Sequence, residues 1–184
     1  SDQDKAIIWR YRYSLIENGR ALGKFLQSAR FHVENELKET MRIFKRWSQI
    51  ELEDALPLLS IKFAANAIYK EEIQHDRQLA KVYNEIRKRA VQCLEKQSTD
   101  TIRSILLQLL QAFRYESFES SELRNFFFKR VFENIHICNS FHWLLHLDKE
   151  NKFNDDEVRE HYVRMYEEFM DIVADDYPEY YANI

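Results

Sequence analysis

The chain has 184 residues, of which 45% are hydrophobic and 32% are charged, and its formal net charge is −4. This length suits one large domain or two small ones, and the composition excludes a disordered chain. The acidic balance argues against a dedicated nucleic-acid binder, which carries a basic excess. Glycine and proline occur only twice each, although tight turns and phosphate-binding loops depend on glycine. The scarcity predicts an all-α protein.

Helical periodicity runs through the N-terminal half of the sequence. It predicts helices over Lys5–Glu17, Arg20–Ser28, Glu34–Ser48 and Glu51–Leu59. In the first of them Ile8, Tyr11 and Leu15 recur on one stripe, which we expect to face the core. The pair Asn18-Gly19 is a typical helix stop.

The same periodicity continues to the C-terminus, so we expect about nine helices joined by short polar turns. A long charged helix or helix pair is predicted from Tyr69 to Lys96, and later helices over Thr101–Arg114, Ser121–Glu133, Asn134–Asp148 and from Asn154 onward. Thr99 or Asp100 is the expected cap of the first of these later helices, and Ser121 of the second. The run Asn154-Asp155-Asp156-Glu157 resembles a capping box.

The helix over Thr101–Arg114 is too apolar for a surface helix, because Leu107 adds a second apolar face to its main stripe. An α-solenoid covers its central helices on both sides, which explains this density. We therefore expect this helix and Ser121–Glu133 to form a central pair. The polar tripeptide Arg114-Tyr115-Glu116 would be a turn whose charges reach water or pair with each other.

Two histidine patterns are the candidate metal ligands. His142 and His146 have the i, i+4 spacing that can hold zinc, but Trp143 replaces the glutamate of an HExxH motif. Glu72 and His75 form one ExxH, whereas a ferritin-like di-iron site needs two. Packed or surface histidines are the preferred interpretation of the first pattern, and the second gives only weak support to a di-iron enzyme.

The basic run Arg87-Lys88-Arg89, with Lys81 and Arg77 upstream, could contact phosphates or anionic lipid. A solvated helix face is the preferred interpretation, because acidic residues are interleaved with the basic ones. The sequence also lacks a glycine-rich phosphate loop and the kinase signatures. We therefore expect no catalytic, cofactor-binding or metal-binding residue in this segment.

Cys93 and Cys138 lie far apart among apolar residues, as buried thiols of a reducing compartment do. No signal peptide opens the chain, and no apolar run reaches the ~20 residues that span a bilayer. We therefore expect an intracellular, soluble protein without direct membrane insertion. The opening Ser1–Lys5, which lacks an initiator methionine, suggests the boundary of an excised segment.

Several segments, in order, resemble the helical accessory domain of phosphatidylinositol 3-kinases. The most specific is LLQLLQAFRYESF at Leu106–Phe118. The others are ALGKFLQS at Ala21–Ser28, RWSQIELEDALPLLS at Arg46–Ser60, LRNFFFKR at Leu123–Arg130 and FHWLLHLD at Phe141–Asp148. WRYRYSL at Trp9–Leu15 and EHYVRMYEEFMDIV at Glu160–Val173 look most like the class III, vacuolar-protein-sorting branch. The sequence departs from the family pattern at Ala64–Asn84, which is longer and more charged than the family's connection before the helix at Arg87–Glu95.

The resemblance implies a right-handed superhelix of antiparallel helix pairs, one accessory domain spanning residues 1–184. A C2 domain would precede it and a catalytic domain would follow. Its role would be non-catalytic: to position the kinase domain relative to the C2 domain and the regulatory subunits of a class III-type complex. The parent enzyme would phosphorylate the 3-position of phosphatidylinositol with ATP and Mg or Mn, peripherally on endosomal or vacuolar membranes, in trafficking and autophagy. We expect exposed apolar residues where other domains dock, with Phe128 and Trp143 as candidates.

Two alternatives stay open beside this interpretation. The helical domain of a class I-like 3-kinase or of a phosphatidylinositol 4-kinase would share the fold. A free-standing helical adaptor would be a complete protein, without a kinase signature in the reading frame that follows.

Overall fold

The computed structural model describes residues 1–65, 77–117, 121–152 and 154–181, and within these ranges it contains helices and no strands. This confirms the all-α prediction. The α-helices are α1 (Asp2–Arg10), α2 (Leu22–Ser28), α3 (Glu34–Arg46), α4 (Leu52–Ala55), α6 (Arg77–Leu94), α7 (Thr99–Phe113), α8 (Glu122–Val131), α9 (Ile135–Glu150), α10 (Asp156–Asp176) and α11 (Pro178–Tyr181). Three 3₁₀ helices, η1 (Gly19–Ala21), η2 (Leu56–Leu59) and η3 (Ile61–Phe63), complete the described elements.

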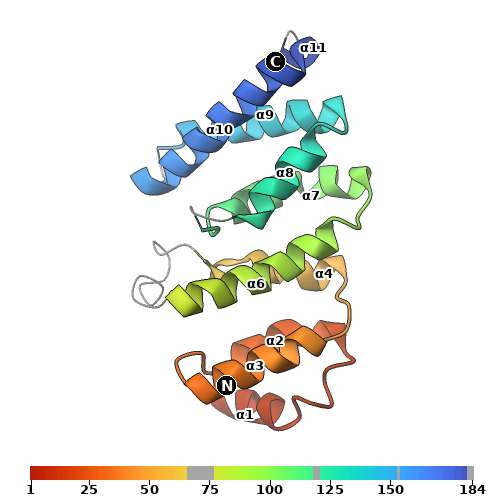
Figure 1. Cartoon of the computed structure of the whole chain (residues 1–184), viewed down its shortest axis with the longest axis vertical. Helices are drawn as coiled ribbons and strands as arrows, with labels where there is room; N and C mark the ends of the chain where they lie inside the picture. Colours follow the sequence, from red (N-terminus) through yellow and green to blue (C-terminus); the bar gives the residue numbers. More distant parts are fainter. Residues whose placement is uncertain (66–76, 118–120, 153, 182–184) are drawn as a thin grey trace.

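The helices are stacked in chain order along the long axis of the molecule (Figure 1). The N-terminal helices α1–α3 lie at one end and α9–α11 at the other. In this view α6, α8 and α10 lie on the near side, with α4, α7 and α9 behind them. The two-layered stack has the form expected of a solenoid, in which each helix pair touches the pairs before and after it.

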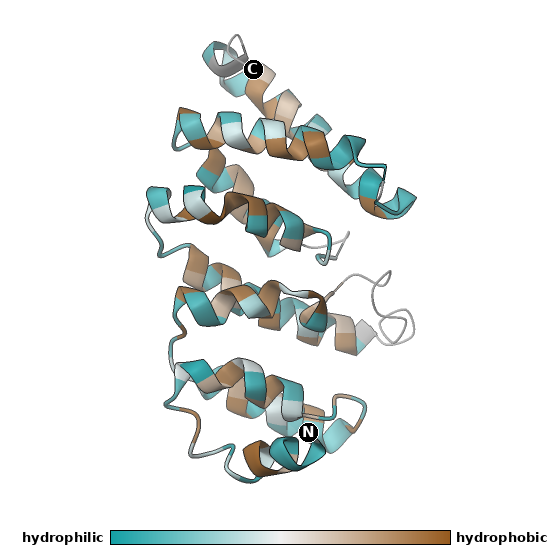
Figure 2. Cartoon of the chain, turned by 180° about the vertical axis from the view of Figure 1, so that it is seen from behind, coloured by the Kyte–Doolittle hydropathy of each residue, from teal (hydrophilic) through white to brown (hydrophobic). Residues whose placement is uncertain are grey.

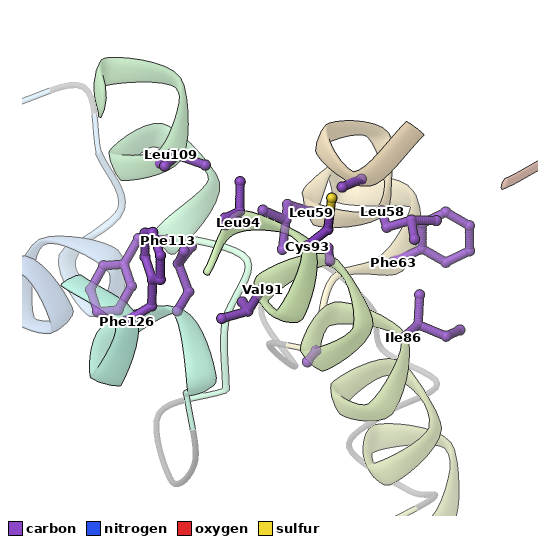
Figure 3. Close-up of a cluster of buried hydrophobic side chains, with 14 of the residues drawn as sticks. Leu58, Leu59, Phe63, Ile86, Val91, Cys93, Leu94, Leu109, Phe113 and Phe126 are labelled. Carbon is purple, nitrogen blue, oxygen red and sulfur yellow. The ribbon is translucent and has the colours of Figure 1, made fainter. Parts of the chain in front are cut away.

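The hydrophobic core runs along the middle of this stack. Side chains from η2, η3, α6, α7 and α8 converge in its central part (Figure 3). Leu109 and Leu110 of α7 are fully buried, and α7 packs between η2 on one side and α9 on the other. The central position predicted for this helix is therefore confirmed.

The second apolar face predicted for α7 is not covered. Leu107 is 49% exposed, so the prediction that its face is buried is wrong. Seen from the opposite side, the helices carry hydrophilic residues interspersed with hydrophobic ones (Figure 2). The density of apolar residues in α7 therefore exceeds what the stack buries, and Leu107 adds apolar surface to the outside of the molecule.

The helix starts follow from capping side chains. Ser121 is the N-cap of α8, as predicted, because its Oγ accepts a hydrogen bond from the Arg124 N–H at 3.0 Å. The cap of α7 is Ser98 rather than Thr99 or Asp100. The capping box predicted at Asn154 does not form: Asp155 is the N-cap of α10 without a side-chain cap bond, and the Asn154 amide donates instead to the Asp148 carbonyl.

The first helix is shorter than the periodicity indicates. It ends at Arg10, and Tyr11, predicted to face the core, is 55% exposed. The chain then turns until the Asn18-Gly19 stop and lies against the connection between α3 and α4. Two hydrogen bonds hold it there: the Ser48 N–H donates to the Ile16 carbonyl, and the Trp47 indole N–H to the Asn18 carbonyl, each at 3.0 Å.

Gly19 is required by this close approach of two backbones. A Cβ at its position would lie 2.5 Å from the Gln49 carbonyl oxygen, well inside van der Waals contact. The other side of the same connection is held by α6: the Arg89 guanidinium donates to the Trp47 and Ser48 carbonyls at 2.7 and 3.0 Å. The α3–α4 connection is therefore hydrogen-bonded on one side to the segment after α1 and on the other side to α6. These bonds join the N-terminal helices to the rest of the stack.

Candidate functional site

The most unusual side chain of the structure is a buried arginine in the middle of the stack. Arg87, on α6, is 1% exposed, although the basic run to which it belongs was predicted to be a solvated helix face. That prediction is wrong for Arg87, because its position on the helix is four residues after Tyr83 and four before Val91, both buried. Arginine is rarely buried unless it is paired.

Arg87 binds the ends of three neighbouring elements. Its Nη1 donates to the Leu59 carbonyl at 2.9 Å and to the Phe63 carbonyl at 3.5 Å. Its Nη2 donates to the Ala112 carbonyl at 3.0 Å. These carbonyls lie in the last turns of η2, η3 and α7, where backbone acceptors lack partners within their own helix and a cation is favoured. One guanidinium therefore joins four elements.

The charge of Arg87 is balanced by Glu116, which is 2% exposed. The Arg87 Nε–H donates to Glu116 Oε1, and Glu116 Oε2 accepts a hydrogen bond from the Ser121 hydroxyl at 2.8 Å. Because Ser121 also caps α8, the pair connects a fifth element. The expectation that the charges of Arg114-Tyr115-Glu116 reach water or pair with each other is therefore wrong for Glu116, which pairs with α6. Arg114 is partly exposed and lies 3.9 Å from Asp148 of α9.

We call this group the arginine junction: Arg87, Glu116, Ser121 and the carbonyls of Leu59, Phe63 and Ala112. A buried ion pair contributes little net stability when it is complete, but removing one partner is costly because the other charge stays buried. The junction also satisfies backbone acceptors at three helix ends. The junction is thus a fixed connection between neighbouring helix pairs, and it sets how the central helices lie relative to one another.

The rest of the basic run points to other partners. Lys88 forms a half-exposed ion pair with Glu122 at 3.2 Å, and Arg89 holds the α3–α4 connection. Lys81 is exposed, and the side chain of Arg77 lies outside the described residues. A small pocket beside the junction is lined by Asn84, Glu85, Arg87, Lys88, Glu116 and Glu122. Three carboxylates face two cations in it, so it offers no excess positive charge to a phosphate.

The histidines considered as metal ligands lie between α9 and α10. The rings of His142 and His146 are 6.2 Å apart between centroids, and His142 is 5% exposed. Burial, with the charges of His146 and Lys149, lowers the pKa of His142. Within the described ranges no group of three or more His, Cys, Asp or Glu side chains could hold a metal ion. The other candidates, Glu72 and His75, lie outside the described residues.

Exposed apolar side chains mark the outer surface of α9. Trp143, predicted to be exposed, is 54% exposed, and Leu147 one turn later is 64% exposed. Phe128 does not share this exposure: it is partly buried against the core, and the Arg124 guanidinium lies 5.3 Å from its ring centroid. No helix of the described residues combines the length and apolar character needed to cross a membrane.

Comparison with known proteins places these features in a family. Residues 1–181 match the model of the phosphoinositide 3-kinase family accessory domain, or PIK domain. The chain is 30% identical over 143 residues to phosphatidylinositol 3-kinase VPS34 of Arabidopsis thaliana, covering 78% of this chain and 15% of that protein.

Two further relatives show the same partial coverage. Phosphatidylinositol 3-kinase pik3 of Schizosaccharomyces pombe is 30% identical over 157 residues, covering 82% of this chain and 17% of that protein. Phosphatidylinositol 4-phosphate 3-kinase C2 domain-containing subunit alpha of Pongo abelii is 31% identical over 145 residues, covering 79% and 8%. The chain spans well under a fifth of the length of these relatives. With its family model matched over almost the whole sequence, the chain belongs to the accessory-domain, or PIK-domain, family of phosphoinositide 3-kinases.

Proposed function

We propose that the chain is the helical scaffold of a class III-like phosphatidylinositol 3-kinase. In this role it holds the kinase domain in a fixed position relative to the C2 domain and the regulatory subunits. The parent enzyme phosphorylates phosphatidylinositol at the 3-position with ATP and Mg²⁺ or Mn²⁺, as a peripheral protein on endosomal or vacuolar membranes. Relatives named as phosphatidylinositol 3-kinases in a plant and a yeast support this substrate.

The arginine junction is the observation that carries the proposal. A scaffold must hold the domains at its two ends in a fixed arrangement. Its helix pairs must therefore be joined at a fixed angle rather than merely packed together. Arg87 meets this requirement, because a single planar guanidinium is shared by η2, η3, α6 and the end of α7. Its five donors are held in a rigid fork, which makes the geometry directional.

The test is a lipid kinase assay on the full-length protein that contains this chain, beside the 184-residue chain alone. Vesicles of phosphatidylinositol and of phosphatidylinositol 4-phosphate are supplied in parallel with ATP and Mg²⁺ or Mn²⁺. We expect the full-length protein to phosphorylate phosphatidylinositol at the 3-position and the chain alone to be inactive. Preference for phosphatidylinositol 4-phosphate would contradict the class III assignment.

A matched pair of variants tests the scaffold role within the same full-length protein. Arg87→Met breaks the junction, whereas Lys88→Met, one residue later, removes only a half-exposed ion pair. We expect Arg87→Met to lower activity and the recovery of regulatory subunits on co-purification, and Lys88→Met to change neither. Full activity and assembly in Arg87→Met would contradict a positioning role. A full-length protein without kinase motifs or activity would instead indicate a free-standing helical adaptor.

A further inference from the structure

The C-terminal helix pair α9–α10 contains an unusual concentration of buried histidines. Four of the six histidines of the chain lie in it: His136, His142 and His146 on α9, and His161 on α10. His142 is 5% and His161 is 9% exposed. Of the other described histidines, His32 and His136 are exposed and His146 is half-buried. Protonation by mild acid therefore places buried imidazolium charges at this pair and not in the other described parts of the stack.

The surroundings of His142, which packs beside His146, favour a neutral imidazole at His142. The two rings are nearly parallel, and the Nδ1 atom of each is buried without a hydrogen-bond partner in the described part of the chain. The opposing helix α10 presents aromatic rings: Tyr166 lies 5.5 and 5.8 Å from the two histidines, and Phe169 lies 6.2 Å from His142. An imidazolium formed at His142 would therefore contact aromatic rings and not a carboxylate of the described residues.

The charged groups near this histidine pair do not offset such a charge. Lys149, on α9, places its ammonium 3.9 Å from the Tyr166 ring centroid and pairs at 3.6 Å with Glu150, which points to solvent. The carboxylate of Asp148, on the same helix, faces Arg114, the residue that follows α7. The electrostatic influences on the pKa of His142 come from His146 and Lys149, and both act with burial to lower it.

His161, on α10, is also buried among aromatic rings and close to cationic side chains. Its ring lies 4.1 Å from Phe113 of α7, between centroids, and 6.5 Å from Tyr162. The charges that act on it are Arg124 of α8 and Arg164 of α10, which themselves pair with Glu168 and Glu160. Burial first, and then these two arginines, lower the pKa of His161 to about 4.

We propose that His142, where α9 packs on α10, and His161, where α10 packs on Phe113 of α7, form an acid-sensitive latch that holds α10 in place at neutral pH and lets the α9–α10 pair open, ahead of the central stack, in mild acid. Neutral rings pack at the interface, whereas an imidazolium formed there would be buried beside Lys149 or beside Arg124 and Arg164. Opening the pair lets the histidines take up protons in water, so acid favours the open form. The latch is a property of this chain and does not depend on the proposed lipid kinase activity.

Hydrogen exchange measured by mass spectrometry on the 184-residue chain tests the latch. Exchange is compared at about pH 7.5 and about pH 5.5, after correction for the intrinsic pH dependence of exchange. With a pKa of about 4 in the folded chain, His161 alone favours opening by about tenfold at about pH 5.5. We expect peptides of α9 and α10 to exchange at least about tenfold faster in acid, and those of α6 and α7 to change less than about twofold.

Two variants separate the latch from general acid sensitivity. The double variant His142→Phe/His161→Phe keeps aromatic rings in an aromatic site but cannot be protonated, so its α9–α10 peptides should lose the acid response. His136→Gln, which changes an exposed histidine of the same helix, should keep it. An acid response that persists in the double variant would overturn the proposal. Hydrogen exchange that accelerates uniformly along the wild-type chain in acid would also overturn the proposal. This second outcome tests the latch even if the double variant fails to fold.

Discussion

The arginine junction predicts an unusually large loss of stability from a single substitution. Arg87→Met keeps an unbranched apolar stem but removes the guanidinium. It leaves Glu116, 2% exposed, as a buried charge that keeps the hydrogen bond from the Ser121 hydroxyl but has lost its cation. It also removes the side-chain donor of the Leu59, Phe63 and Ala112 carbonyls. The variant thus combines a buried charge that has lost its ion-pair partner with the loss of a side-chain donor at three helix ends, of which the Ala112 carbonyl keeps its hydrogen bond from the Tyr115 N–H.

The magnitude follows from these contacts. Removing one partner of a buried ion pair costs about 3–5 kcal/mol, a large part of the about 5–15 kcal/mol by which a typical domain is stable. Lys88→Met is the matched control, because it breaks a neighbouring pair with Glu122 whose side chains are 45% and 42% exposed. Exposed pairs contribute only about 0–1 kcal/mol. The two adjacent substitutions should therefore differ by about 2–5 kcal/mol.

The assay is urea unfolding of the 184-residue chain, followed by far-UV circular dichroism. Glu116→Gln and the double variant Arg87→Met/Glu116→Gln complete a double-mutant cycle. Since the two side chains touch, the cycle should give a coupling energy of about 1–3 kcal/mol. A loss below about 1 kcal/mol for Arg87→Met, or a loss equal to that of Lys88→Met, would refute the assignment of a central role to this arginine.

Three further results are expected from unfolding experiments on the same chain. Gly19→Ala should cost about 1–3 kcal/mol, because the new methyl would lie 2.5 Å from the Gln49 carbonyl oxygen. Gly23→Ala in α2 should be neutral or stabilising, since the nearest neighbour of its new methyl is 3.9 Å away. Equal effects of the two substitutions would contradict the close approach at Gly19. Leu109→Ala should cost about 2–5 kcal/mol and Leu107→Ala less than about 0.5 kcal/mol, because the first side chain is buried and the second is 49% exposed. The pKa of His161 is lowered to about 4 in the folded chain, so the unfolded chain protonates this histidine first as the pH falls below about 6.5. The free energy of unfolding should therefore be about 2 kcal/mol lower at about pH 5 than at neutral pH. Urea midpoints measured across this range should fall less steeply in His161→Phe, and unchanged steepness would contradict the effect.

Much of the fold could be predicted because it depends on local patterns. Apolar residues at helical spacing identified α3, α7 and α9, and the hydroxyl of Ser121 identified the start of α8. The end of α1 was missed because its periodicity continues through Tyr11 while the chain turns away to meet the α3–α4 connection. Contacts between segments about 30 residues apart decide that turn, and no local pattern encodes them.

The arginine junction was missed for a related physical reason. Charged residues around Arg87 are typical of a solvated helix face, and its partner Glu116 lies 29 residues later in what looked like an exposed turn. A usable signal was present: Arg87 falls on the same stripe as Tyr83 and Ala90, both buried. A charge on the apolar stripe of a helix should prompt a search for an opposite charge at the end of another helix.

The backbone hydrogen bond from the Ala65 N–H to the Tyr115 carbonyl, 2.8 Å long, has an evolutionary consequence. It fixes the chain at the point where residues 66–76 begin, and the start of α6 fixes the point where they end. Because both anchor points belong to the stack itself, residues can be added or lost between them without shifting the register of the helices. Within Ala64–Asn84, where we expect a departure from the family pattern, the stretch 66–76 is thus a place where lineages can diverge in length, whereas Arg77–Asn84 belong to α6.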